Sequence, residues 1–269
     1  MAIITLTTDF GLQDHFVGTL KGVILGIAPT ATIVDVSHAI PAFDVLDGAL
    51  TIASAYKYFP DGSVHVVVVD PGVGSARRPI VARSGGHYFV GPDNGVLSAV
   101  SVGEVRELAS PKYFLSTVSK TFHARDIFAP VAAHLAAGVA FTKFGPEISN
   151  YVRLDIPRPK LDGGVWHGVV LKVDRFGNLI TNIGPQDVPP LFHSRGAAFK
   201  MILGGREINK IFSAYSSGAP GAVFAIAGSM GYLEIAANQS SAAEILKIGK
   251  GAEFSLTLPE KPPRKVIRV

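Results

Sequence analysis

The chain has 269 residues, of which 48% are hydrophobic and 17% charged, so it is long enough for one large domain or two ordinary ones and too apolar to be disordered. Its net charge of +4 comes from scattered lysines and arginines; the one basic cluster, "EKPPRKVIRV" at 260–269, is expected to be a solvated end, with no nucleic-acid partner. The sequence has no cysteine, which excludes disulfides, thiolate nucleophiles and cysteine-ligated zinc.

The N-terminus opens directly on β-branched sequence, without the basic leader of a signal peptide. No apolar run reaches the roughly 18 residues that a membrane span needs. We therefore expect a cytoplasmic protein without a membrane partner.

The first half alternates strand-like and helix-like segments. The run "VHVVVVD" at 64–70 is too continuously apolar for a strand with one wet face, and such strands joined by helices indicate a parallel sheet covered on both sides. An α/β domain with a mostly parallel sheet flanked by helices is therefore predicted for 1–157. Its strands are placed at 2–8, 31–37 and 64–70, and its helices at 14–29, at 44–60 and, after a loop, within 123–138.

The second half changes character. The Pro- and Gly-rich stretch "IPRPKLDGG" at 156–164 is predicted to be a linker. After it, alternating residues predict strands in "VWHGVVLKVD" and "AEFSLTLP" and a hairpin around Gly204-Gly205, whereas helical periodicity is confined to a short stretch near "SAAEIL". A smaller β-rich domain, a barrel or a sandwich, is therefore predicted for 164–269.

Polar residues end three of the predicted strands of the first domain. "TLTTD" ends at Asp9, "VDVSH" at His38 and "VVVVD" at Asp70. Ligands bind in the crevice at the carboxyl ends of the strands of an open parallel sheet. One such aspartate can be only a turn former or a helix cap, but two of them together with Arg77 and the loop "TFHARD" favour a site.

These residues suit the activation of water. The chain lacks the third glycine of a dinucleotide fingerprint after "GVG", and it has no GxxxxGK[ST], GxSxG or HExxH motif. A strand-end carboxylate such as Asp9 can accept hydrogen bonds from both hydroxyls of a ribose. Asp70, Arg77 and His123 form an acid–base group without a nucleophilic side chain, in which Asp70 or His123 takes up a proton and Arg77 orients the carboxylate or stabilises hydroxide. By itself, His123 could equally be a structural histidine.

Six sequence blocks resemble the S-adenosylmethionine (SAM) hydroxide adenosyltransferase family, the SAM hydrolases that are related to the SAM-dependent fluorinase and chlorinase. The resemblance covers both predicted domains in the same order. The blocks are "TLTTDFGxxDxxVGxxKG" (5–22), "VVDPGVGSxRR" (68–78), "GPDNG" (91–95), "TFHARDIFAPVAAHLA" (121–136), "VDRFGNLITNI" (173–183) and "GSMGYLEIAxNQxSA" (228–242).

The resemblance implies hydrolysis of SAM to adenosine and L-methionine by SN2 attack of water-derived hydroxide at C5′, with SAM as substrate and without a metal or another cofactor. It implies a homotrimer with sites between neighbouring subunits. The catalytic set is implied to be Asp70, Arg77 and His123. The implied substrate-binding residues are Asp9 at the ribose, Phe43 and Phe122 around it, Asp174 and Ser229 at the methionine end, and Asn178 at the adenine.

Several alternatives remain open from the sequence. Asn178 after Gly177 is typical of a plain turn, and Ser229 could be an ordinary loop hydroxyl. The same chemistry with chloride in place of hydroxide would make the protein a chlorinase. A non-catalytic SAM- or adenosine-binding protein and, on the strength of Asp9 and Asp70, a metal-dependent nucleotidase are the alternatives from other classes.

Overall fold

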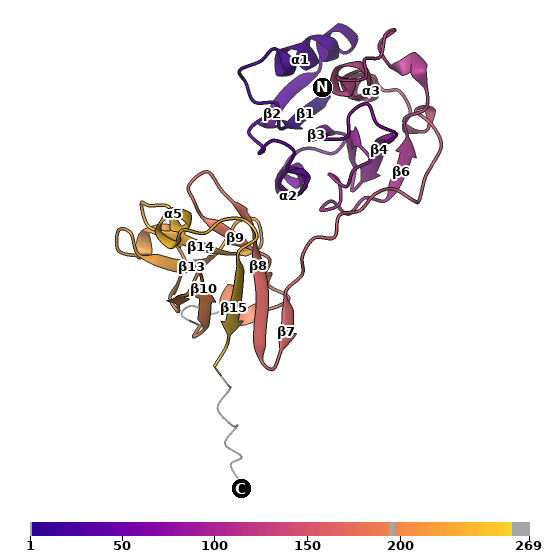
Figure 1. The fold of residues 1–269 in the computed structure, drawn as a ribbon. Helices are drawn as coiled ribbons and strands as arrows, with labels where there is room; N and C mark the ends of the chain where they lie inside the picture. Colours follow the sequence, from indigo (N-terminus) through magenta and orange to yellow (C-terminus); the bar gives the residue numbers. More distant parts are fainter. Residues whose placement is uncertain (1, 194–196, 260–269) are drawn as a thin grey trace. The chain divides into compact units, whose positions relative to one another are not determined.

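The computed structural model describes residues 2–193 and 197–259, so the basic cluster at 260–269 lies outside the described residues (Figure 1). The chain divides into two compact units, 1–156 and 157–269, coloured indigo to magenta and orange to yellow in Figure 1. The fold class predicted from the sequence is confirmed. The first unit is a mostly parallel sheet with helices, and the second is built on β-strands.

The sheet of the first unit has the strand order β2-β1-β3-β5-β4-β6. Strand β1 pairs parallel with β2 and β3, and β3 pairs parallel with β5, whereas β4 runs antiparallel to both β5 and β6. The antiparallel edge was not predicted; it comes from a hairpin that turns at Gly85-Gly86, both with positive φ. The strands are β1 (Ile3–Thr8), β2 (Thr32–Ser37), β3 (Val64–Val68), β4 (Pro79–Ser84), β5 (His87–Pro92) and β6 (Glu104–Glu107).

Strand β3 is buried on both faces, as its unbroken apolar run predicts. On one face Val66 and Val68 share a core with Leu20 of α1. On the other face Val67 shares a core with Ile52 of α2. The helices of this unit are α1 (Phe16–Ile27), α2 (Val45–Ala55) and α3 (Ala129–Ala136), with 3₁₀ turns at Tyr56–Tyr58, Pro111–Tyr113 and Phe141–Lys143 and a π-helical turn, η3, at Ala124–Phe128.

The second unit is one long, mainly antiparallel sheet in the order β11-β10-β15-β8-β9-β14-β13-β12, with β7 added beside β8. Its core is formed by buried residues such as Leu179, Met201 and Ile235. The strands are β7 (Lys160–Asp162), β8 (Val165–Val173), β9 (Leu179–Thr181), β10 (Lys200–Leu203), β11 (Arg206–Ile208), β12 (Ile211–Phe212), β13 (Val223–Ala227), β14 (Leu233–Ala237) and β15 (Glu253–Thr257), with helices α4 (Pro189–His193) and α5 (Ala242–Leu246) and a 3₁₀ turn, η5, at Tyr215–Ser217.

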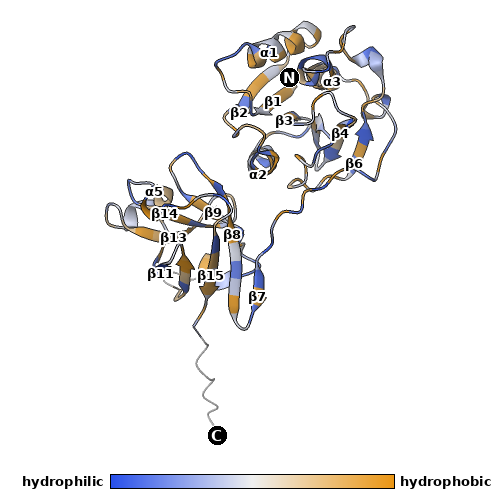
Figure 2. Cartoon of the chain, viewed as in Figure 1, coloured by the Kyte–Doolittle hydropathy of each residue, from blue (hydrophilic) through white to orange (hydrophobic). Residues whose placement is uncertain are grey.

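The predicted linker 156–164 is wrong in its second part. Residues 160–162 form β7, which pairs antiparallel with β8 through a turn at Gly163-Gly164. Strand β7 is exposed at every position and mostly hydrophilic (Figure 2). Its polarity and neighbouring prolines are typical of a linker, whereas the two glycines with positive φ are typical of a tight hairpin turn.

Among the described residues, no helix is both long and apolar enough to cross a bilayer.

A buried pair of histidines lies in the core of the first unit. The Thr5 hydroxyl and His65 Nδ1 are 2.7 Å apart, and His65 Nε2 lies 3.2 Å from His87 Nδ1. The His65 ring stacks on Phe89 at a centroid distance of 5.0 Å. Burial and, to a lesser extent, the neighbouring His87 lower the pKa of His65 to about 3.

This pair predicts that the first unit loses stability in acid. In the unfolded chain His65 binds a proton below about pH 6.5, whereas in the folded chain it stays neutral down to about pH 3. The unfolded state therefore binds more protons in this window, and the free energy of unfolding falls as the pH falls, by at most on the order of 4–5 kcal/mol. Urea unfolding followed by circular dichroism at several pH values measures this slope. His65→Gln should flatten it, and the same change at exposed His167 should not.

Candidate active site

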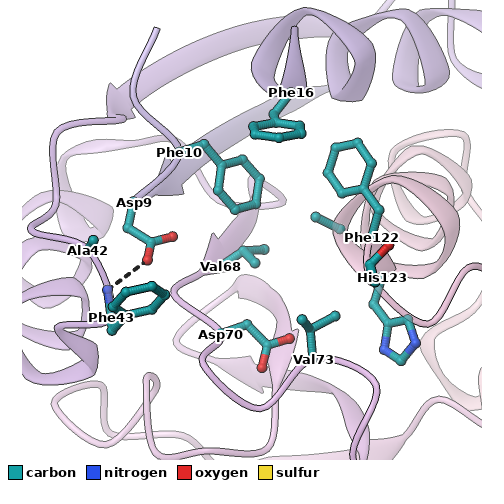
Figure 3. Close-up of a pocket in the computed structure, with 12 residues that line it drawn as sticks. Asp9, Phe10, Phe16, Ala42, Phe43, Val68, Asp70, Val73, Phe122 and His123 are labelled. Carbon is teal, nitrogen blue, oxygen red and sulfur yellow. Dashed lines mark hydrogen bonds between the residues drawn. The ribbon is translucent and has the colours of Figure 1, made fainter. Parts of the chain in front are cut away.

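A cavity of about 280 Å³ opens at the carboxyl end of the first unit's parallel strands. Asp9 follows β1 directly, and Asp70 lies just beyond β3. The two carboxylates face the cavity from the ends of neighbouring strands (Figure 3). This is the place where ligands bind in open parallel sheets. Half of the remaining lining residues come from the loops before α2 and η3. The full set is Phe10, Phe16, Ala42, Phe43, Val68, Val73, Thr121, Phe122, His123 and Ala124.

The three residues predicted as catalytic lie together and form a hydrogen-bonded trio, which we call the acid–base trio (Asp70, Arg77 and His123). Arg77 Nε donates to Asp70 Oδ1 at 3.0 Å, and Arg77 Nη2 donates to Asp70 Oδ2. The same Nη2 donates to His123 Nδ1 at 2.9 Å. The side chains of Asp70 and Arg77 are only 6% and 8% exposed, so this is a buried ion pair. Arg77 Nη1 is buried and has no hydrogen-bond partner among the residues that the structure describes.

These contacts determine which proton His123 carries. Because a guanidinium only donates, Nδ1 of His123 is an acceptor, and the proton of the neutral ring is on Nε2. Burial and then the charge of Arg77 lower the pKa of His123, against the opposing charges of Asp70 and Asp126. His123 is therefore neutral at neutral pH and presents an N–H donor.

Asp9 is tied to an aromatic residue in an unusual conformation. The backbone N–H of Phe43 donates to Asp9 Oδ2 at 2.9 Å (Figure 3). Phe43 has a φ of +68°, in the left-handed region that bulky residues avoid, and its side chain is exposed. Such a conformation costs roughly 1–3 kcal/mol and persists only where neighbouring contacts hold it. A second contact stabilises the backbone next to Phe43. The carboxylate of Asp44, the following residue, accepts from the Asp47 N–H and so caps the N-terminus of α2.

A second cavity, of about 680 Å³, lies in the second unit and contains the other predicted binding residues, Asp174, Asn178 and Ser229. Asp174 Oδ1 accepts from the N–H groups of Phe176 and Asn178 at 2.8 and 2.9 Å, and Asp174 Oδ2 accepts from the Asn178 side chain at 2.8 Å. The turn interpretation of this stretch is therefore correct as geometry, and the same side chains also line a cavity. The predicted site residues thus form two groups, one on each unit.

Glu234 and Tyr215 line this second cavity and were not predicted. Glu234, on β14, is buried, and the Tyr215 hydroxyl donates to its Oε2 at 3.0 Å. Burial raises the pKa of Glu234, and burial together with Glu234 raises the pKa of Tyr215 to about 12. The sequence feature that could have indicated Glu234 is its place as one acidic residue in the otherwise apolar strand "LEIAA". An acidic residue is rarely buried without a partner.

Comparison with known proteins supports the family resemblance of the sequence blocks over both units. A model of the SAM hydroxide adenosyltransferase N-terminal domain matches residues 4–145, and a model of the C-terminal domain of the same family matches 168–255. A Salinispora tropica protein named (R)-S-adenosyl-L-methionine hydrolase is 39% identical over 94% of this chain and 97% of its own length. A fluorinase from an Actinoplanes species is 29% identical over 95% of this chain and 97% of its own. The crystal structure of an uncharacterized conserved protein from Thermotoga maritima superimposes with a TM-score of 0.88 at 35% identity, over 96% of this chain and all of that one.

Proposed function

This chain belongs to the SAM hydroxide adenosyltransferase family, and we propose on that premise that it hydrolyses S-adenosyl-L-methionine to adenosine and L-methionine. The observation that carries the proposal is the acid–base trio, which is joined by hydrogen bonds and presents Asp70 and His123 to a cavity at the strand ends. Hydrolase relatives at 37–39% identity support water as the nucleophile, and the fluorinases are more distant.

The reaction is a single displacement at C5′ of the adenosyl group. An O–H bond of water breaks, its oxygen forms a bond to C5′, and the C5′–S bond breaks with its electron pair going to the methionine sulfur. The sulfonium is already an activated leaving group, so the proposal needs neither a metal nor a covalent intermediate. Holding water and C5′ in line can lower the barrier by up to roughly 7–11 kcal/mol.

The hydrogen bonds of the trio suggest separate roles for its members. His123 has its Nδ1 occupied by Arg77 and its remaining proton on Nε2, so it donates a hydrogen bond to the attacking water rather than taking a proton from it. Asp70 then takes the proton. Arg77 orients both groups and keeps them in contact in a buried site.

The substrate-binding roles follow from the family resemblance and belong to the same proposal. In the first unit, Asp9 accepts from the ribose hydroxyls, and Phe43 and Phe122 pack around the sugar. In the second unit, Asp174 and Ser229 hold the methionine end, and Asn178 contacts the adenine. The homotrimer with sites between neighbouring subunits is the remaining part of the proposal, and sedimentation equilibrium of the purified protein tests it separately.

The test is to incubate the purified protein with SAM in water enriched in heavy oxygen and to separate the products by chromatography. We expect methionine and adenosine, with the solvent isotope in the 5′ hydroxyl. The hydrolase relatives are named for the (R) epimer, so both sulfonium epimers should be compared, and we expect the (R) epimer to be consumed faster.

Three results would contradict the proposal. SAM that is bound but stays intact would indicate a non-catalytic SAM-binding protein. Formation of 5′-chloro-5′-deoxyadenosine in chloride, at the expense of adenosine, would indicate a chlorinase. Loss of turnover in chelator would point to the metal-dependent alternative.

A further inference from the structure

The loop that carries Phe122 and His123 is held by a buried carboxylate that has no part in the reaction proposed above. Asp126, in the π-helical turn η3, is fully buried. Its Oδ2 accepts from the backbone N–H of Ser119 at 2.8 Å, and its backbone carbonyl accepts from the N–H of Leu115 at 2.9 Å. Asp126 therefore fixes both ends of the segment 115–119, three residues before Phe122.

The neighbouring Arg125 completes this arrangement. Arg125 Nε donates to Asp126 Oδ1 at 2.6 Å, and Arg125 Nη2 donates to Asp126 Oδ2 at 3.0 Å. In this bidentate ion pair, Cζ of Arg125 lies 5.1 Å from the centroid of the Phe122 ring. The Phe122 ring also packs edge-on against Phe10 and Phe16. The pair thus contacts Phe122, a residue that lines the cavity.

Asp126 also acts on His123. The charged groups that influence the His123 ring are Arg77 and Asp70 on the loop after β3 and Asp126 on its own turn. Among them, Asp126 is the carboxylate that is not bonded to Arg77. π-Helical turns frequently lie at functional sites.

We infer that Arg125 and Asp126 are positioning residues, which hold Phe122 against the cavity and fix the place and charge environment of His123. The inference rests on the proposed SAM hydrolysis for its kinetic effect. Its effect on His123 is independent of any substrate, so it can be tested separately.

Asp126→Asn is the main variant, because asparagine keeps the size of the side chain and can still accept from the Ser119 N–H but carries no charge. We expect kcat to fall roughly 10–10²-fold with a smaller change in KM, the range expected when a catalytic group is misplaced by about an ångström. We also expect the His123 ring to titrate at lower pH in NMR spectra, because a carboxylate that favours the protonated ring has been removed. The acid limb of the kcat profile should move in the same direction.

Asp93→Asn is the matched control. Asp93 is a buried carboxylate of the same unit that also pairs with an arginine, Arg78 at 2.7 Å, and accepts from a backbone N–H, that of Val152 at 2.7 Å. The Asp93→Asn variant should lose about as much stability as Asp126→Asn, whereas the pH at which the His123 ring titrates should not change. If Asp126→Asn fails to fold, Arg125→Gln, which leaves the Asp126 charge in place, should lower kcat with little change in the His123 titration.

The outcomes separate the two claims. An Asp126→Asn variant with unchanged kcat and an unchanged His123 titration would overturn the inference. So would equal losses of kcat in Asp126→Asn and Asp93→Asn with no movement of the His123 titration, because this would be a general folding effect. If the wild-type protein left SAM intact, the proposed function would fail, and the NMR titration would still decide the role of Asp126 at His123.

Discussion

Replacing Asp70 by asparagine is expected to lower kcat by about 10²–10⁴-fold, the usual contribution of a positioned general base. Asp70 is the carboxylate of the trio that lines the cavity, and the amide that replaces it cannot take a proton from water. Because the size of the side chain is kept, the dissociation constant of SAM should change much less than kcat. Single-turnover kinetics and calorimetric titration with SAM measure the two quantities separately.

Asp93→Asn again serves as the control, since it removes another buried, arginine-paired carboxylate from the same unit. It should retain most of the turnover. An Asp70→Asn variant that keeps the wild-type kcat, or that loses SAM binding and turnover by the same factor, would contradict the role of Asp70 as a base.

Replacing Arg77 by methionine is expected to abolish turnover and to destabilise the first unit by about 3–5 kcal/mol, the cost typical of leaving a buried charge unpaired. Arg77 bonds both oxygens of the buried Asp70 carboxylate and also the ring of His123. Without it, the carboxylate is left in a site from which water is largely excluded. Urea unfolding of the variant measures the stability loss.

The double variant Arg77→Met/Asp70→Asn distinguishes a stability effect from a catalytic one. It leaves no unpaired charge at this place, so it should regain part of the lost stability while staying inactive. If the double variant is as unstable as Arg77→Met alone, the buried ion pair does not explain the loss. If Arg77→Met keeps measurable turnover, the guanidinium is not needed to assemble the trio.

The order of helices and strands in the first unit was predictable because its apolar residues form clear strand-like runs and recur at helical spacing between them. The predicted segments 2–8, 14–29, 31–37 and 64–70 correspond to β1, α1, β2 and β3. The unbroken apolar run of β3 reflects burial on both faces and also indicated a parallel sheet.

The antiparallel parts were harder to predict. The β4–β5 hairpin and strand β7 both depend on Gly-Gly turns, at 85–86 and 163–164. Strand β7 has only three residues, all exposed, so it is too short for an alternation of apolar and polar residues to indicate a strand. The hairpin at Gly204-Gly205 was predicted and is confirmed, and its strand β10 alternates between exposed and buried positions.

The candidate site also has a part that the sequence predicted and a part that it did not. The acid–base trio spans 46 residues between Arg77 and His123, and nothing in the spacing alone places them in contact. The position of Asp70 at a strand end predicted its place, and the chemistry of the residue types indicated Arg77 and His123 as its partners; the family resemblance implied the same three residues. Glu234 was not found because a single acidic residue in a strand usually lies on a wet face.

The backbone at Gly74 has a consequence for the assembly of the acid–base trio. A Cβ at Gly74, which has a φ of +78°, would lie 2.3 Å from the carbonyl oxygen of Lys120. The segments that bear Arg77 and His123 therefore pack main chain against main chain at this glycine. Any side chain at position 74 would push these two segments apart, so the contact between Arg77 and His123 depends on this glycine.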